Sequence, residues 1–151
     1  MFKVSSKGRY AVKAVYELAL HAGRGPETVG SIAHAQGIPE QYLEQLMPLL
    51  KRAGLVTGTR GAQGGYQLAR PPETVSVRDV VTAVEGPLVV TNCRGVYGSG
   101  CPQGHDCIGP DVWIRVREAV DEAMNQITMD RLINEQHVVA RHKMQGLAGI
   151  G

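Results

Sequence analysis

The chain has 151 residues, of which 43% are hydrophobic and 20% charged, enough for one domain with a modest core or a small domain with an appendage. No apolar run approaches the roughly eighteen residues of a spanning helix, and no secretion signal opens the chain, so we expect a cytoplasmic protein without a membrane span. The net charge of +2 hides a basic first half: residues 1–70 carry nine Lys and Arg against four acids, as expected of a module that binds a polyanion.

Helical periodicity predicts three helices in the first third of the chain, over 7–22, 29–36 and 39–53. Thr28 is positioned to cap the start of the second helix, and Gly37 to end it. The third helix has apolar positions at helical spacing, namely Leu43, Leu46, Met47 and Leu50. Two helices joined by so short a turn match a helix-turn-helix, with 39–53 as the recognition helix.

A short β-hairpin is predicted next, with strands at 55–58 and 65–68 around a glycine-rich tip that carries Arg60. Directly after a helix-turn-helix, a flexible cationic hairpin is typical of a wing. An ordinary surface hairpin would have the same local pattern. Ser76 and Asp79 then predict a capping box that opens a short helix through Glu85.

A longer helix is predicted from about Asp111, with an apolar stripe at alternating spacings of three and four residues: Trp113, Val116, Val120, Ala123 and Ile127. Two heptads are fewer than a coiled coil needs, so packing on the helix's own domain is an alternative. We favour a dimerisation helix, because a winged-helix module of this size leaves little open core to receive another helix. A further turn or short helix over 128–135 and a flexible tail follow.

The three cysteines lie close together, at Cys93, Cys101 and Cys107, in a loop-like stretch rich in glycine. An odd, clustered set in a cytoplasmic chain points to metal or redox chemistry rather than structural disulfides. Three thiolates on flexible backbone can converge on an iron–sulfur cluster, [2Fe-2S] or [4Fe-4S], which generally needs a fourth ligand. The alternatives are a zinc site completed by His105, without the usual C-x2-C pair, and a thiol switch.

Candidate DNA contacts come from three places in the chain. Polar residues near the start of the recognition helix are placed to read base edges, namely Gln41, Tyr42, Glu44 and Gln45. Lys7 and Arg9 are candidates for phosphate contacts, and Arg60 suits a narrow minor groove. No catalytic motif of the hydrolase, P-loop, dinucleotide-binding or zinc-protease kind is present, so we do not expect an enzyme.

Four stretches together resemble the iron–sulfur cluster regulator (IscR-like) family of bacterial winged-helix transcription factors. They are Ser6-Lys7-Gly8-Arg9-Tyr10-Ala11-Val12, Tyr42-Leu43-Glu44-Gln45-Leu46, Gly54-Leu55-Val56 and Arg60-Gly61-x-x-Gly64-Gly65-Tyr66. The resemblance covers about residues 1–135 and implies a homodimer on a palindromic double-stranded operator. It also implies cluster ligation by the three cysteines and DNA binding by the recognition helix and the wing, including Gly61, Gly64, Gly65 and Tyr66.

Two departures from the family pattern concern the cluster. The first cysteine interval is seven residues where the family usually has about five, and Pro110 stands where IscR-type members have a histidine ligand. The fourth ligand is therefore left open between His105, a residue of the partner subunit and a small molecule.

The predicted fold is mainly α with a small β wing. It comprises a winged-helix DNA-binding domain over 1–85, a cysteine-rich cluster-binding loop over 86–109, a dimerisation helix and following turn over 110–135, and a flexible tail over 136–151. The expected function is a transcriptional regulator, a repressor, that senses iron–sulfur cluster, redox, iron or nitric oxide status. The alternative is a zinc-stabilised or thiol-switch regulator, or a cysteine-metabolism-type repressor that acts through a protein partner.

Overall fold

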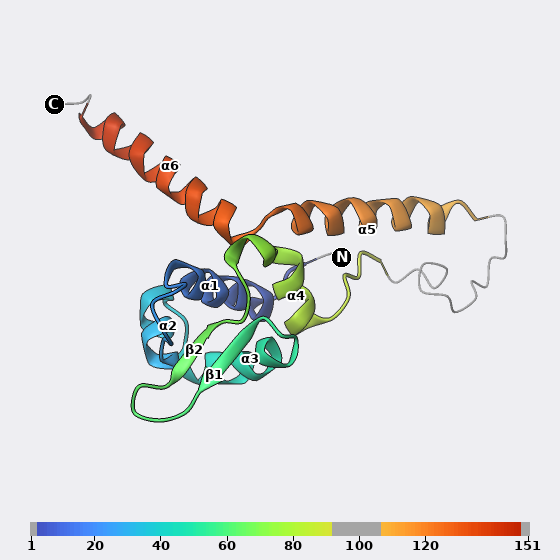
Figure 1. Cartoon of the computed structure of the whole chain (residues 1–151). Helices are drawn as coiled ribbons and strands as arrows, with labels where there is room; N and C mark the ends of the chain where they lie inside the picture. Colours follow the sequence, from blue (N-terminus) through green and yellow to red (C-terminus); the bar gives the residue numbers. More distant parts are fainter. Residues whose placement is uncertain (1–2, 92–106, 149–151) are drawn as a thin grey trace.

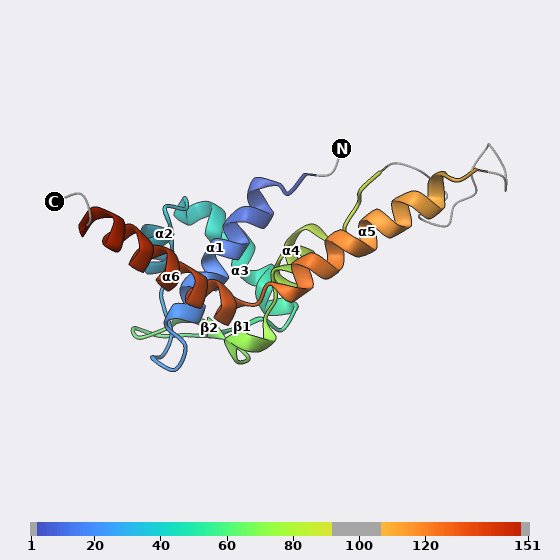
Figure 2. The ribbon, with the colours of Figure 1, turned by 90° about the horizontal axis from the view of Figure 1, so that it is seen from above.

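The structure is a computed structural model that describes residues 3–91 and 107–148. Its elements are α1 (Ser6–Leu20), α2 (Val29–Gln36), α3 (Glu40–Arg52), β1 (Val56–Thr59), β2 (Gly65–Leu68), the 3-10 helix η1 (Pro72–Thr74), α4 (Val77–Glu85), α5 (Gly109–Gln126) and α6 (Met129–Ala148). Helices α1 to α4 and the hairpin form a body from which α5 and α6 extend in different directions (Figures 1 and 2). The predicted mainly α fold with a two-stranded wing is confirmed.

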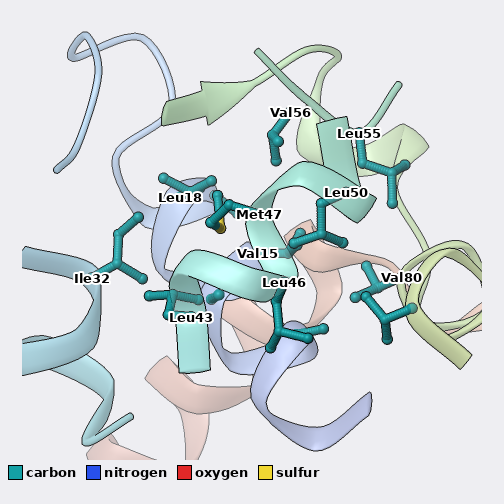
Figure 3. Close-up of a cluster of buried hydrophobic side chains, with 14 of the residues drawn as sticks. Val15, Leu18, Ile32, Leu43, Leu46, Met47, Leu50, Leu55, Val56 and Val80 are labelled. Carbon is teal, nitrogen blue, oxygen red and sulfur yellow. The ribbon is translucent and has the colours of Figure 1, made fainter. Parts of the chain in front are cut away.

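The core of the body forms around α3, whose four apolar positions face inwards (Figure 3). Leu43, Leu46, Met47 and Leu50 are each at most 1% exposed. The 3.6-residue period places them on one side of the helix, so the polar residues between them are left on the outside. Around them lie buried side chains of the neighbouring helices, among them Val15, Leu18, Ile32 and Val80.

The helix boundaries follow the local signals in the sequence. The Thr28 hydroxyl accepts a hydrogen bond from the Ser31 N–H at 3.1 Å, and Gly37 ends α2 in the left-handed conformation with φ 63°. At the start of α4, the Ser76 hydroxyl accepts from the Asp79 N–H at 3.1 Å, and the Asp79 carboxylate accepts from the Ser76 N–H at 3.0 Å. The predicted N-cap, glycine stop and capping box are all confirmed.

The wing hairpin is joined to the body through a third backbone segment. Strands β1 and β2 pair antiparallel, from Val56 opposite Leu68 to Thr59 opposite Gly65. On the other side of β2, Glu27 exchanges two backbone hydrogen bonds with Tyr66, of 2.8 and 2.7 Å. The segment before α2 therefore fixes the base of the wing, a contact that the sequence pattern did not predict.

The junction between α5 and α6 is anchored on the body. The Val77 N–H donates to the Ile127 carbonyl at 2.8 Å, and the Met129 N–H donates to the Val75 carbonyl at 2.9 Å. The Met129 side chain is fully buried in the core. The two long helices thus leave the body from one fixed point, between α4 and η1.

The last helix is longer than predicted. Residues 128–135 were expected to form at most a short helix before a flexible tail over 136–151, but α6 continues to Ala148. Helical structure therefore extends over 136–148, within the segment predicted as a flexible tail. The start of α6 is held by the buried Met129, and adding residues to an existing helix costs far less than nucleating a new one. Residues 136–148 contain a single glycine and no proline, so nothing stops the helix earlier.

Candidate nucleic-acid interface and metal centre

The outer face of α3 presents polar side chains to solvent. Gln41, Glu44 and Gln45 are exposed, on the side opposite the buried leucines. Tyr42 is half-buried, because its ring packs edge to face against that of Tyr10 in α1, with ring centroids 5.3 Å apart. The side chains of Gln41, Glu44 and Gln45 are therefore accessible to another molecule, and that of Tyr42 is partly accessible.

Exposed cations lie on two helices, α1 and α3. Lys7 and Arg9 are exposed in the first turns of α1, and Lys51 and Arg52 are exposed at the end of α3. Arg9 donates a hydrogen bond to the Ser6 hydroxyl at 3.0 Å. In the described part of the chain none of these four cations forms an ion pair, so their charge is available to phosphate.

The wing requires glycine at three of its predicted DNA-binding positions. Gly61 has a φ of +109° at the exposed tip, beside the exposed Arg60. A Cβ at Gly64 would lie 2.2 Å from the Thr59 carbonyl oxygen, and one at Gly65 would lie 2.2 Å from the Glu27 carbonyl oxygen. These glycines allow the hairpin to close and to approach the body, whereas the side chain that extends from the tip is that of Arg60.

Tyr66 lies at the base of the wing. Its backbone pairs with Glu27, and its ring covers Gly58 so closely that a Cβ there would be 3.3 Å from Cε1 of the ring. The Lys51 ammonium is 3.7 Å from the same Cβ position. The ring of Tyr66 and the side chain of Lys51, from the end of α3, therefore both lie next to Gly58 in β1.

One of the three predicted cysteine ligands lies within the described residues. Cys107 is a half-buried free thiol directly before α5, and its sulfur accepts a hydrogen bond from the Gly109 N–H at 3.4 Å. Cys93, Cys101 and the candidate ligand His105 lie outside the described residues. Thiolates suit iron–sulfur clusters and zinc, and N–H donors to the sulfur are a usual feature of such ligands. Cys107 thus fits a ligand role in its chemistry.

Pro110 occupies the first turn of α5, where the missing N–H of proline costs no hydrogen bond. Pro110, at the position where the resemblance implies a histidine ligand, therefore helps to start the helix. In the residues that the structure describes, no group of three His, Cys, Asp or Glu side chains converges on a metal position.

Helix α5 has an exposed apolar face. None of its 18 residues is buried, and the large apolar side chains Val112, Trp113 and Val116 are 39–41% exposed. Exposed apolar side chains gathered on one face mark an interaction surface. No helix in the described part of the chain has the length and apolar character needed to cross a bilayer.

Sequence reasoning missed one polar contact between distant elements. The Glu85 carboxylate, at the end of α4, accepts hydrogen bonds from the Ser5 N–H at 2.9 Å and the Gly8 N–H at 3.1 Å. It also contacts the Ser5 hydroxyl. Because the partners are about 80 positions apart, no local pattern in the sequence could reveal this contact.

Comparison with known proteins gives consistent matches over most of the chain. Residues 4–135 match the Rrf2 family model, described as an iron-dependent transcriptional regulator. The chain is 38% identical to the HTH-type transcriptional regulator IscR of Erwinia tasmaniensis, over 91% of the chain and 82% of that protein.

Two solved structures extend this similarity to the fold. The structure of CymR, the global cysteine regulator of B. subtilis, has a TM-score of 0.75 and 36% identity, covering 89% of this chain and 98% of the other. The structure of IscR from T. potens has a TM-score of 0.72 and 39% identity, covering 89% of this chain and 88% of the other.

Proposed function

The chain belongs to the Rrf2 family of transcriptional regulators, and from that premise we propose that it is a homodimer that binds a palindromic operator and carries an iron–sulfur cluster on Cys93, Cys101 and Cys107. Its relatives are named as transcriptional regulators, so the chain is a regulator and not an enzyme. The observation that carries the DNA-binding part of the proposal is the division of α3 into a buried apolar face and an exposed polar face. Exposed cations on α1 and α3 that form no ion pair with the described residues add to it.

The exposed face of α3 has the chemistry to read base edges in a major groove. Gln41 and Gln45 can each pair with adenine through two hydrogen bonds, and the Glu44 carboxylate can accept from the amino group of cytosine. Arg60 at the wing tip suits the negative potential of a narrow minor groove. The cations around α3 and α1 would position the protein through the phosphates.

The apolar stripe of α5 supports a dimer. The first half of this helix extends away from the body (Figure 1), and Trp113 and Val116 are 40% and 39% exposed. A second copy that presents the same stripe would bury it around a twofold axis. Such an axis would relate the two recognition helices by symmetry, and a dimer of this kind binds the half-sites of a palindromic operator about one DNA turn, roughly 34 Å, apart.

The cysteine-rich loop over 86–109, here called the cysteine segment, leads directly into this dimer helix. The sulfur of Cys107 accepts a hydrogen bond from the N–H of Gly109, and Gly109 is the first residue of α5. A bound cluster would supply a group that responds to oxidants, iron supply or nitric oxide. The fourth ligand is proposed among His105, a residue of the partner subunit and a small molecule. Any shift of the Cys107 sulfur would act on the start of the helix that sets the dimer geometry.

Purification without oxygen tests the cluster. We expect a coloured protein whose visible absorption accompanies stoichiometric iron and sulfide. A colourless protein with stoichiometric zinc would contradict the cluster and leave DNA binding intact. DNA binding is tested separately, by selecting duplexes from a randomised pool with the wild-type protein and titrating the selected duplex at several salt concentrations. Affinity that does not fall with salt would contradict phosphate-driven binding.

The similarity to CymR supports a second candidate, a zinc-stabilised or thiol-switch regulator, or a cysteine-metabolism-type repressor that acts through a protein partner. This candidate predicts zinc or no metal in the purified protein. It also predicts that mild oxidation of the thiols, or addition of the protein partner, changes the affinity for the selected duplex. Replacing Cys101 by Ala distinguishes the iron–sulfur proposal from the zinc proposal when metal content is measured together with DNA binding.

A further inference from the structure

The first turn of α1 is capped by a side chain from another helix. Ser5 occupies the N-cap position of α1, but its own side chain caps none of the helix's N–H groups. The Oε1 atom of Glu85 takes that role, with the Ser5 N–H at 2.9 Å, the Gly8 N–H at 3.1 Å and the Ser5 hydroxyl as donors. A carboxylate at a helix N-terminus is also favoured by the helix dipole.

Gly8 is the residue that permits this contact. A Cβ at this position would lie 2.8 Å from Oε1 of Glu85 and 2.9 Å from Cγ1 of Val4, and both distances are too short. Gly8 is also buried, and the Glu85 carboxylate lies against it. The pair therefore acts as a latch between the end of α4 and the start of α1, and we refer to it as the Glu85–Gly8 latch.

The latch lies between the cysteine segment and the recognition helix. On one side, Glu85 is followed directly by Gly86 and Pro87, which line a cavity of about 150 Å3 together with Val4. On the other side, the turn that Glu85 caps leads to Tyr10, whose ring packs on Tyr42 of α3. The first turns of α1 also carry Lys7 and Arg9.

We propose that Glu85 is a positioning residue, through which the start of the cysteine segment sets the placement of the first turn of α1 and, by the Tyr10–Tyr42 contact, of the recognition helix. This inference rests on the proposed DNA-binding function. It adds a chain of contacts that leads from Gly86, through Glu85 and the first turn of α1, to the recognition helix. Glu85 acts through its three hydrogen bonds and not by touching DNA.

Charge and positioning predict opposite effects of removing this carboxylate. Loss of a negative charge strengthens binding to a polyanion, because fewer like charges face the phosphates. Loss of the cap releases the first turn of α1 and weakens binding. Glu85→Ala removes both charge and acceptor, whereas Glu85→Gln removes the charge and keeps a carbonyl oxygen for the same N–H donors. The two variants thus separate the two effects.

The experiment measures affinity for the duplex selected by the wild-type protein, with the full-length dimer. We expect Glu85→Ala to weaken binding by up to about tenfold, the size of one lost cap, and Glu85→Gln to match or exceed the wild type. Glu73→Gln, which removes the same charge from an exposed site on η1, is the control and should not weaken binding. Gly8→Ala should weaken binding in the wild type and less in the Glu85→Ala background, because the close contact with Glu85 is then absent and only that with Val4 remains.

Two further readouts complete the test. Amide exchange at Gly8 should speed up in Glu85→Ala and remain slow in Glu85→Gln, while circular dichroism should show that both variants remain folded at the temperature of the binding measurement. Unchanged or tighter binding by Glu85→Ala would overturn the inference, as would equal losses of binding in the Ala and Gln variants. If the wild-type protein selects no duplex at all, the proposed DNA-binding function fails instead, and the two failures are thereby distinguished.

Discussion

The ring of Tyr10 in α1 meets the ring of Tyr42 in α3 edge to face, with 81° between the ring planes. The contact joins the first helix of the chain to the helix that presents Gln41 and Gln45. It explains why Tyr42 is half-buried although Gln41, Glu44 and Gln45 on the same helix are exposed. The recognition helix is thus held from its outer edge as well as through its buried leucines.

The energy of this aromatic contact is measurable. We expect the variants Tyr10→Leu and Tyr42→Leu to show a coupling of about 0.5–1.5 kcal/mol in a double-mutant cycle, the usual range for an edge-to-face pair. The free energy of unfolding in urea provides the measurement. Tyr16→Leu, a half-buried tyrosine on the same helix as Tyr10, is the control and should show no coupling to Tyr42. Full additivity of the first pair would contradict the contact.

Gly65→Ala should detach the wing from the body. The added Cβ would lie 2.2 Å from the Glu27 carbonyl, at a φ of +150° that favours glycine. We expect a loss of more than about 1 kcal/mol in unfolding free energy and weaker operator binding. Ala62→Gly, in the exposed turn of the same hairpin, should change stability far less. Wild-type stability and binding in Gly65→Ala would show that the Glu27–Tyr66 pairing is not needed.

Arg60→Ala tests the wing contact with DNA. The side chain is exposed and makes no ion pair within the described residues, so its removal leaves the fold intact. We expect weaker binding of the selected duplex, and a plot of log affinity against log salt whose slope is smaller by about one. Fluorescence anisotropy at four salt concentrations measures both quantities. An unaltered slope and affinity would show that Arg60 does not contact the DNA.

The dimer can be tested by placing charge on the stripe of α5. A double variant, Trp113→Glu with Val116→Glu, should give a folded monomer, because no residue of α5 is buried in its own chain and both substituted side chains are exposed. Analytical ultracentrifugation gives the mass, and circular dichroism reports the fold. Arg115→Glu introduces the same side chain on the same helix away from the stripe and should remain dimeric. A double variant with wild-type mass would place the dimer interface elsewhere.

Met129 should be the most sensitive position of the long helices. It is fully buried at the junction of α5 and α6, whereas Met144 on the same helix is 71% exposed. Met129→Ala removes buried volume and is expected to cost about 2–5 kcal/mol of unfolding free energy. Met144→Ala is the matched control, with an expected change within about 0.5 kcal/mol of the wild type. Chemical denaturation compares the two, and equal effects would contradict the anchoring of α6.

Much of the architecture could be read from the chain itself. Apolar spacing identified α3 and its buried face, Thr28 and Ser76 marked the helix starts, and glycines with Arg60 marked the wing. These signals work because they act within a few residues: a helix period decides which side chains share a face, and a cap is satisfied inside one turn. The length of α6 was missed, because its residues lack a clear apolar stripe while nothing in them ends a helix.

The tertiary structure alone decided which distant segments meet. Glu85 accepts a hydrogen bond from the N-cap residue of α1, which lies 80 positions earlier. Glu27 pairs with Tyr66 at the base of the wing, and Tyr10 packs on Tyr42. Such contacts have no periodic signature, because they depend on where the packed core places each backbone in space. The basic first half of the chain thus predicted a polyanion-binding module from composition, whereas the placement of its cations and of the recognition helix depends on these few long-range contacts.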